Sequence, residues 1–104
     1  MNFEWNEEKS DRCLRDRGFD FAYVLPCFYD PYRLVQIDNR RDYGEVRYQM
    51  IAQAHRRLFF TVYTVRISLT RIISARKANL REIRSYEKNL NKNWSNGSTI
   101  TTQG

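Results

Sequence analysis

Two apolar segments of strand length lie close together in the second half of the chain, and each carries cationic residues at its end. They are 59–66, Phe-Phe-Thr-Val-Tyr-Thr-Val-Arg, and 72–78, Ile-Ile-Ser-Ala-Arg-Lys-Ala. A tight turn near 67–70 can join them as an antiparallel hairpin. Arg66 and Arg76 then come from strands of one sheet. Such a sheet is a scaffold for binding phosphate, because a guanidinium offers five hydrogen-bond donors in a rigid fork and stays charged.

Length and composition predict one soluble domain. The chain has 104 residues, of which 41% are hydrophobic, and this suffices for one packed core but not for a second domain. No apolar run approaches the roughly 18 residues of a membrane span. After residue 92 the composition shifts to Asn, Ser, Thr and Gly, which predicts a domain over residues 1–92 and a disordered polar tail over 93–104.

Positive charge is concentrated in the second half of the chain. Residues 1–53 hold 8 Lys and Arg against 10 Asp and Glu, net −2, whereas residues 54–104 hold 10 against 2, net +8. A basic half favours a polyanion such as nucleic acid as the partner. Two alternatives stay open, since this half could also be a solvated surface or a docking patch for an acidic protein.

Several classes of chemistry are excluded by counting residues. The four glycines are too scattered for a GxGxxG or Walker-type phosphate loop. His55 is the only histidine, which removes two-histidine ribonuclease chemistry and ordinary His/Cys zinc sites, and we expect it in an exposed hairpin turn. Cys13 and Cys27 fit no metal spacing, and the N-terminus has no secretion signal. We therefore expect a cytoplasmic protein with two reduced core thiols, no cofactor and no metal.

Helix signals predict three helices. The first lies near 7–17, between an Asn cap and a terminating glycine. The second begins after Asp20 and contains Pro26, which should shorten or kink it. The third lies near 80–91, after a capping-box pattern.

Strand signals complete an α+β fold. A short strand is expected over residues 2–5. Four antiparallel strands are expected near 34–38, 45–52, 58–65 and 69–75, with Tyr48, Met50 and Ala52 on one face.

Six short motifs follow one another along the chain. They are Phe3-Glu4-Trp5-Asn6-Glu7-Glu8-Lys9, Leu14-Arg15 to Gly18, Phe28-Tyr29-Asp30-Pro31, Gly44-Glu45-Val46-Arg47-Tyr48, Val62-Tyr63-Thr64-Val65-Arg66, and Ile72 to Ala78 leading to Tyr86-Glu87. Their order is that of the BrnT-type toxins, which the chain resembles over about residues 3–88. It departs at Asp16-Arg17-Gly18, where the family commonly has Lys-His-Gly, and at 53–57, which lacks the usual glycines.

The resemblance implies a small RelE-like domain with two N-terminal helices, a four-stranded antiparallel sheet and a C-terminal helix. It also implies an endoribonuclease toxin of a type II toxin–antitoxin system that cleaves RNA and inhibits growth. The implied partner is a BrnA-type ribbon-helix-helix antitoxin, in a 2:2 assembly that reaches operator DNA only through the antitoxin.

The predicted site is dominated by arginines. By the resemblance, the catalytic residues are Glu45, Thr64, Arg66 and Arg76, and the RNA-binding residues are Arg47 and Lys77, to which we add Arg71. Cleavage through the 2′-hydroxyl needs a base, an acid and stabilisation of phosphate charge, and arginines serve the last need without a metal ion.

Each of these roles has a plainer alternative. Glu45 is the nominated base, but it could merely form a salt bridge with Arg47 or Arg66. Thr64 could be an ordinary strand residue, and Arg66 and Arg76 could be solvated strand ends. The rival function is a non-catalytic module, either an inactive toxin relative that binds the antitoxin or a basic RNA-binding domain.

Overall fold

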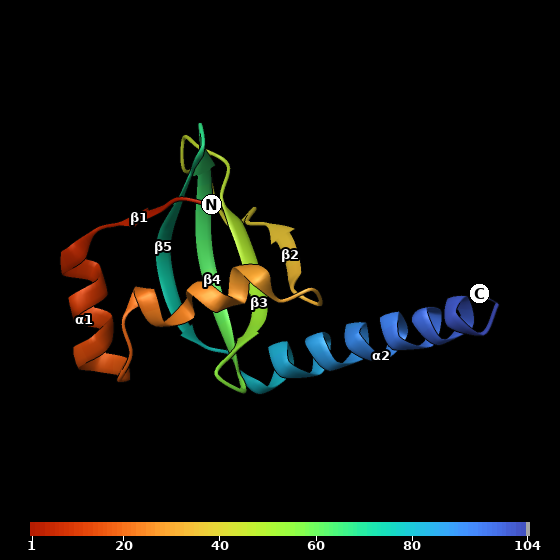
Figure 1. Cartoon of the computed structure of the whole chain (residues 1–104). Coiled ribbons are helices and arrows are strands. Elements are labelled where there is room, and N and C mark those ends of the chain that lie inside the picture. Colours follow the sequence, from red (N-terminus) through yellow and green to blue (C-terminus); the bar gives the residue numbers. More distant parts are fainter. Residues whose placement is uncertain (104) are drawn as a thin grey trace.

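One sheet of five strands organises the chain, in the order β1-β5-β4-β3-β2. The computed structural model describes the fold of residues 1–103 and the side chains of residues 1–92. The strands are β1 (Phe3–Trp5), β2 (Leu34–Ile37), β3 (Tyr48–Ala54), β4 (Arg57–Arg66) and β5 (Leu69–Lys77), and the helices are α1 (Glu7–Arg17), η1 (Phe21–Tyr29) and α2 (Leu80–Gln103). In Figure 1, η1 crosses the front of the sheet, α1 stands at the β5 side, and α2 leaves the base of the sheet.

The α+β class is confirmed, but the prediction of four antiparallel strands is wrong. β1 adds a fifth strand and makes the sheet mixed, because it pairs in parallel with β5 at Phe3↔Thr70, Glu4↔Arg71 and Trp5↔Ile72. The other neighbours are antiparallel. A parallel partner lies far along the chain and is joined by no tight turn, so the local sequence carries no signal for this pairing.

The predicted hairpin forms between β4 and β5. Arg66 pairs with Leu69, which leaves Ile67 and Ser68 as a two-residue turn, and Ser68 has a φ of 55°. At the other end of the hairpin, Arg76 pairs with Phe60. Antiparallel pairing therefore places Arg66 and Arg76 at opposite ends of the sheet.

The predicted second helix is a nine-residue 3₁₀ helix with Pro26 inside it. Its N-cap is Asp20, whose carboxylate accepts a hydrogen bond from the Tyr23 amide at 3.0 Å. The buried residues Phe21, Val24 and Cys27 recur every three positions, which is the period of a 3₁₀ helix and aligns them on one face. The apolar spacing of η1 thus matches its tighter winding.

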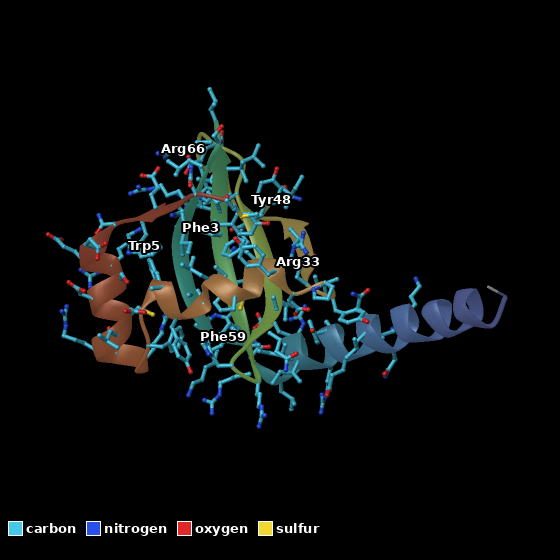
Figure 2. All side chains as sticks on the ribbon, in the orientation of Figure 1. Phe3, Trp5, Arg33, Tyr48, Phe59 and Arg66 are labelled. Atoms are coloured by element: carbon cyan, nitrogen blue, oxygen red, sulfur yellow. The ribbon has the colours of Figure 1, made fainter. Side chains whose placement is uncertain are left out.

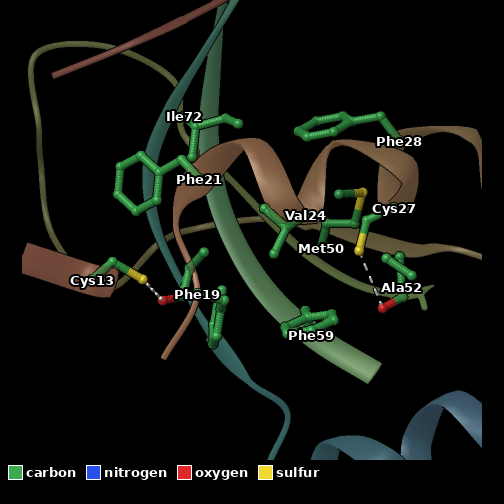
Figure 3. Close-up of a cluster of buried hydrophobic side chains, with 12 residues drawn as sticks. Cys13, Phe19, Phe21, Val24, Cys27, Phe28, Met50, Ala52, Phe59 and Ile72 are labelled. Carbon is green, nitrogen blue, oxygen red and sulfur yellow. Dashed lines mark hydrogen bonds between the residues drawn. The ribbon is translucent and has the colours of Figure 1, made fainter. Parts of the chain in front are cut away.

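The core lies between η1, α1 and the front face of the sheet (Figure 3). The predicted face of β3 is confirmed, since Met50 and Ala52 are fully buried there. Both cysteines are free and buried, as expected, and their thiols donate to the carbonyl oxygens of Ala75 and Ala52 at 3.5 Å. Burial raises the pKa of Cys27 to about 12, so this thiol is neutral at physiological pH.

His55 lies in the predicted exposed turn between β3 and β4. The turn has two residues, His55 and Arg56, both with positive φ (53° and 63°) and neither a glycine. The imidazole stacks on Tyr23, with ring centroids 3.8 Å apart, and its Nε2 lies 2.8 Å from the Tyr23 carbonyl oxygen. These contacts fix a turn geometry that usually calls for glycine.

The helix boundaries agree only in part with those predicted from the sequence. α1 has the predicted bounds, with Asn6 and Gly18 as its caps. α2 begins as predicted but ends at Gln103 rather than near residue 91. The separate polar tail at 93–104 stays a prediction, because it falls outside the described side chains. Within the described residues, no helix combines the length and apolar character needed to cross a membrane.

The buried Asp30 carboxylate connects three elements at the base of the sheet. It accepts hydrogen bonds from the Tyr32 amide, from the Gln53 amide of β3 and from the Tyr86 hydroxyl of α2, each at 2.8 Å. Burial, followed by the bond to Asp30, raises the pKa of Tyr86 far above its usual range. Tyr86 therefore remains a neutral donor that anchors α2.

Replacing Tyr86 with Phe should remove this donor and leave a buried carboxylate under-bonded. We expect the free energy of unfolding to fall by about 2 kcal/mol, because hydrogen bonds to charged groups are the stronger class. For a domain of this size the melting temperature should drop by roughly 10 °C in thermal denaturation. Tyr29→Phe, at an exposed tyrosine of η1, is the matched control. Equal melting temperatures for the two variants would contradict the anchoring role.

Candidate functional site

The sheet face opposite η1 carries most of the predicted site residues, and we call it the rear face. Side chains alternate along a strand, so the rear face of β4 holds Phe60, Val62, Thr64 and Arg66. The paired positions on β5 are Arg76, Ser74, Arg71 and Leu69, in register across an irregularity between Val62 and Tyr63. Arg66 and Arg76 thus share one face.

Five charged residues form an ionic cluster at the upper end of the rear face, near Arg66 in Figure 2. Glu45 pairs with Arg47 at 3.4 Å and with Arg66 at 3.3 Å. Glu4 pairs with Arg71 at 2.9 Å and lies 3.9 Å from Arg66. We call these residues the arginine–glutamate cluster. Its three arginines outnumber its two carboxylates, so the cluster retains a positive charge.

Strand pairing brings the members of the cluster together. Glu4 lies opposite Arg71 in the β1–β5 register, and Arg71 lies opposite Thr64 in the β4–β5 register. The Thr64 hydroxyl donates to the Val46 carbonyl oxygen at 2.7 Å and so attaches the segment that carries Glu45 and Arg47. Thr64 is buried, which fits the alternative that it is a structural strand residue.

The loop before β3 is held by a second buried carboxylate, Asp38. Arg40 binds both of its oxygens at 2.8 and 2.7 Å, and the Tyr43 hydroxyl donates to it at 3.2 Å. The hydrogen bonds from Arg40 hold the pKa of Asp38 well below its usual range, despite the opposing effect of burial. The Tyr43 ring in turn lies 4.2 Å from the Arg47 guanidinium, a cation–π contact that orients this arginine.

Exposure and charge differ among the members of the cluster. The Arg66 side chain is 52% exposed and Glu45 only 27%, so Arg66 is the member most accessible to a ligand. The hydrogen bond from Arg66 lowers the pKa of Glu45, with a further contribution from Arg47. Glu45 is therefore ionised at neutral pH and acts as an acceptor.

Arg76 occupies a different place, near the base of the rear face. Six positions of β4 separate its partner Phe60 from Arg66, which corresponds to roughly 20 Å at the rise of a strand. Glu82 binds its guanidinium through two hydrogen bonds of 2.8 Å, and the Phe60 ring lies 4.1 Å away. Burial is the largest effect on Glu82 and would raise its pKa, but the hydrogen bonds from Arg76 and the Asn79 amide, together with the nearby arginine charges, lower the pKa overall.

A cleft of about 480 Å³ opens beside Arg76, between the sheet and the first turns of α2. Its lining includes Gln36, Gln49 and Phe60 as well as Arg76 and Glu82. Lys77, the next residue after Arg76, is exposed and by strand alternation points to the opposite face.

The structure therefore brings together four of the predicted residues, Glu45, Arg47, Arg66 and Arg71. Thr64 supports them through its hydrogen bond to the Val46 carbonyl oxygen. It does not bring Arg76 or Lys77 to this cluster. Sequence reasoning missed Glu4 and Tyr43. Glu4 belongs to the first motif of the chain, but its pairing with Arg71 depends on a parallel register over 67 residues.

In the part of the chain with described side chains, no three His, Cys, Asp or Glu residues are grouped to hold a metal ion.

Comparison with known proteins identifies a family. A family model described as "Ribonuclease toxin, BrnT, of type II toxin-antitoxin system" matches residues 5–82 of the 104. The matched range contains Glu45, Arg47, Arg66 and Arg71, and it begins one residue after Glu4. No curated protein matches the chain.

Proposed function

The chain belongs to the BrnT family of ribonuclease toxins of type II toxin–antitoxin systems, and we propose that it cleaves RNA at the arginine–glutamate cluster without a metal ion. The observation that supports this site most strongly is the convergence of Arg47, Arg66 and Arg71, from the loop before β3 and from strands β4 and β5, on two carboxylates. Such pre-positioned guanidinium groups are suited to charge that develops on a phosphate during cleavage.

Phosphate binding at Arg66 begins with an exchange of partners. The fork of a guanidinium binds phosphate and carboxylate with similar geometry, so an RNA phosphate can replace Glu45 on Arg66. Arg66 is held by Glu45 and Glu4 at 3.3 and 3.9 Å, longer than the 2.8 Å bonds that hold Arg76. The longer contacts make Arg66 the easier arginine to transfer to a substrate.

The exchange also releases Glu45 to act as the base. Without the hydrogen bond from Arg66, its pKa rises toward the usual range for a carboxyl, and its oxygen can accept the proton of the 2′-hydroxyl. The 2′-oxygen then bonds to phosphorus, the bond to the 5′-oxygen breaks, and the leaving oxygen takes a proton from solvent. The products are a 2′,3′-cyclic phosphate and a free 5′-hydroxyl.

Replacing Arg66 with Ala should lower the cleavage rate by about 10² to 10³, as expected for the loss of one preorganised donor. The side chain is half exposed, so the melting temperature should change little, and growth inhibition on expression should be lost. Lys at this position should rescue the rate only in part, because it keeps the charge and loses the fork. Arg84→Ala, at an exposed arginine of α2, is the control and should stay toxic. Full toxicity of Arg66→Ala would place the site elsewhere.

Cleavage should persist in excess EDTA, because the arginines supply the cationic charge. Its products should be 2′,3′-cyclic phosphate ends, detected by mass spectrometry of a short RNA. The apparent affinity for RNA should fall as salt rises, since phosphate contacts release counterions. Strict dependence on magnesium would refute the mechanism. Inactivity combined with intact antitoxin binding would favour the rival function of a non-catalytic binding module.

We further propose that a BrnA-type ribbon-helix-helix antitoxin covers the cluster end of the sheet in a 2:2 assembly. Type II systems pair a toxin with a protein antitoxin, and apolar side chains that are more than half exposed surround this end of the sheet. They are Ile37, Val46, Val65 and Ile67. A partner that buries them would also shield Arg66 from RNA.

Co-expression with a BrnA-type antitoxin should yield a complex whose mass, from size-exclusion chromatography with light scattering, equals two copies of each protein. A dimeric ribbon-helix-helix antitoxin that links two toxins accounts for this stoichiometry. Val65→Glu should release the toxin from the complex, whereas Leu14→Glu, at a similarly exposed site on α1, should not. A monomeric toxin that does not bind the antitoxin would contradict the assembly.

A further inference from the structure

We propose that the cleft at the base of the rear face binds one nucleoside unit of the RNA and sets the sequence preference of cleavage. This inference rests on the proposed function, because it takes RNA as the substrate. The cleft volume of about 480 Å³ falls within the range of small-molecule sites, and its floor includes the apolar side chains of Leu34, Ile51 and Phe60.

Arg76 offers a flat surface on which a base can stack. Its guanidinium is held by the two hydrogen bonds from Glu82 and by the Phe60 ring, so its plane is fixed, while 37% of the side chain stays exposed. Glu82 also neutralises its charge. A rigid, neutralised guanidinium is better suited to stacking than to phosphate capture, and arginine planes are common stacking surfaces for unpaired RNA bases.

The amides of Gln36 and Gln49 supply hydrogen bonds for the edge of a base. These residues are directly opposite each other in the β2–β3 register, and Gln36 Nε2 donates to Gln49 Oε1 at 2.9 Å. One such bond uses only part of the capacity of two amides, which together still offer both donors and acceptors to the cleft. A surface with both kinds of group can distinguish one base from another.

Cations around the cleft fit the charge of a nucleotide. The lining holds three arginines, Arg40, Arg76 and Arg81, against one glutamate, Glu82. Arg81 forms no ion pair within the described residues, and Arg40 is 60% exposed although it pairs with Asp38. These two arginines can therefore approach the phosphates on either side of the bound base.

The cleft and the arginine–glutamate cluster share the rear face, about 20 Å apart along β4. A single RNA strand can pass over both, with its scissile phosphate at Arg66 and a base in the cleft. The preferred base should then lie a few nucleotides from the cut, rather than directly beside it.

The test maps cut positions in a randomised single-stranded RNA for the wild type, Gln36→Leu and Gln49→Leu. Leucine keeps the size of the side chain and removes its hydrogen bonds. We expect the preference for one base at a position away from the cut to fall about tenfold in each variant, measured as the ratio of cuts with and without that base. Gln53→Leu, on the same face of β3 but outside the cleft, should keep the wild-type profile. An unchanged profile in both cleft variants would overturn the proposal.

A binding measurement separates this inference from the proposed function. In ¹H–¹⁵N spectra of the wild type titrated with each of the four nucleoside 5′-monophosphates, the side-chain amides of Gln36 and Gln49 should shift with at least one of them. Shifts confined to the cluster end would overturn the cleft as a subsite. If the protein cleaves no RNA but these amides still shift, the proposed reaction fails and the nucleotide subsite stands.

Discussion

The Asp30 carboxylate is the constraint on which the base of this structure depends. It is buried after η1 and accepts one hydrogen bond each from the Tyr32 amide, from Gln53 on β3 and from Tyr86 on α2. A buried carboxylate is tolerated only when such partners replace its water, so the three elements must meet at this point. Because Tyr86 holds α2 against β3, the first turns of α2 form the wall of the cleft that contains Glu82 and Ser85.

The two ends of the rear face use the same chemical pair in different ways. At the base, Glu82 accepts two hydrogen bonds of 2.8 Å from the Arg76 guanidinium. Its carboxylate also caps α2, by accepting a hydrogen bond from the Asn79 amide at 2.9 Å. At the upper end, Arg66 is shared between Glu4 and Glu45 over longer distances and stays half exposed. The first pair supports the fold, whereas the second leaves a guanidinium positioned but available. This contrast is why we assign the reaction to the upper end.

Local sequence signals predicted much of the framework. The caps Asn6 and Gly18 gave the bounds of α1, and the spacing of Tyr48, Met50 and Ala52 gave the buried face of β3. A salt bridge of Glu45 with Arg47 or Arg66 was one alternative named from the sequence, and the structure contains both pairs. Arg66 and Arg76 were also predicted to share one phosphate site, because both lie on neighbouring strands of one sheet. That prediction did not take into account that the two residues lie at opposite ends of those strands. Antiparallel pairing separates them by about 20 Å.

The sequence by itself determined the class of the fold, the hairpin at 59–78 and the family, because these depend on periodicity, turn length and ordered motifs that are local in the chain. Only the tertiary structure decided which charges meet. Glu4 reaches Arg71 and Arg66 through a parallel pairing that spans 67 residues, and the cleft exists only where β2, β3 and α2 converge. Contacts of this kind depend on register and on the docking of whole elements, and neither leaves a mark on neighbouring residues that could be read in advance.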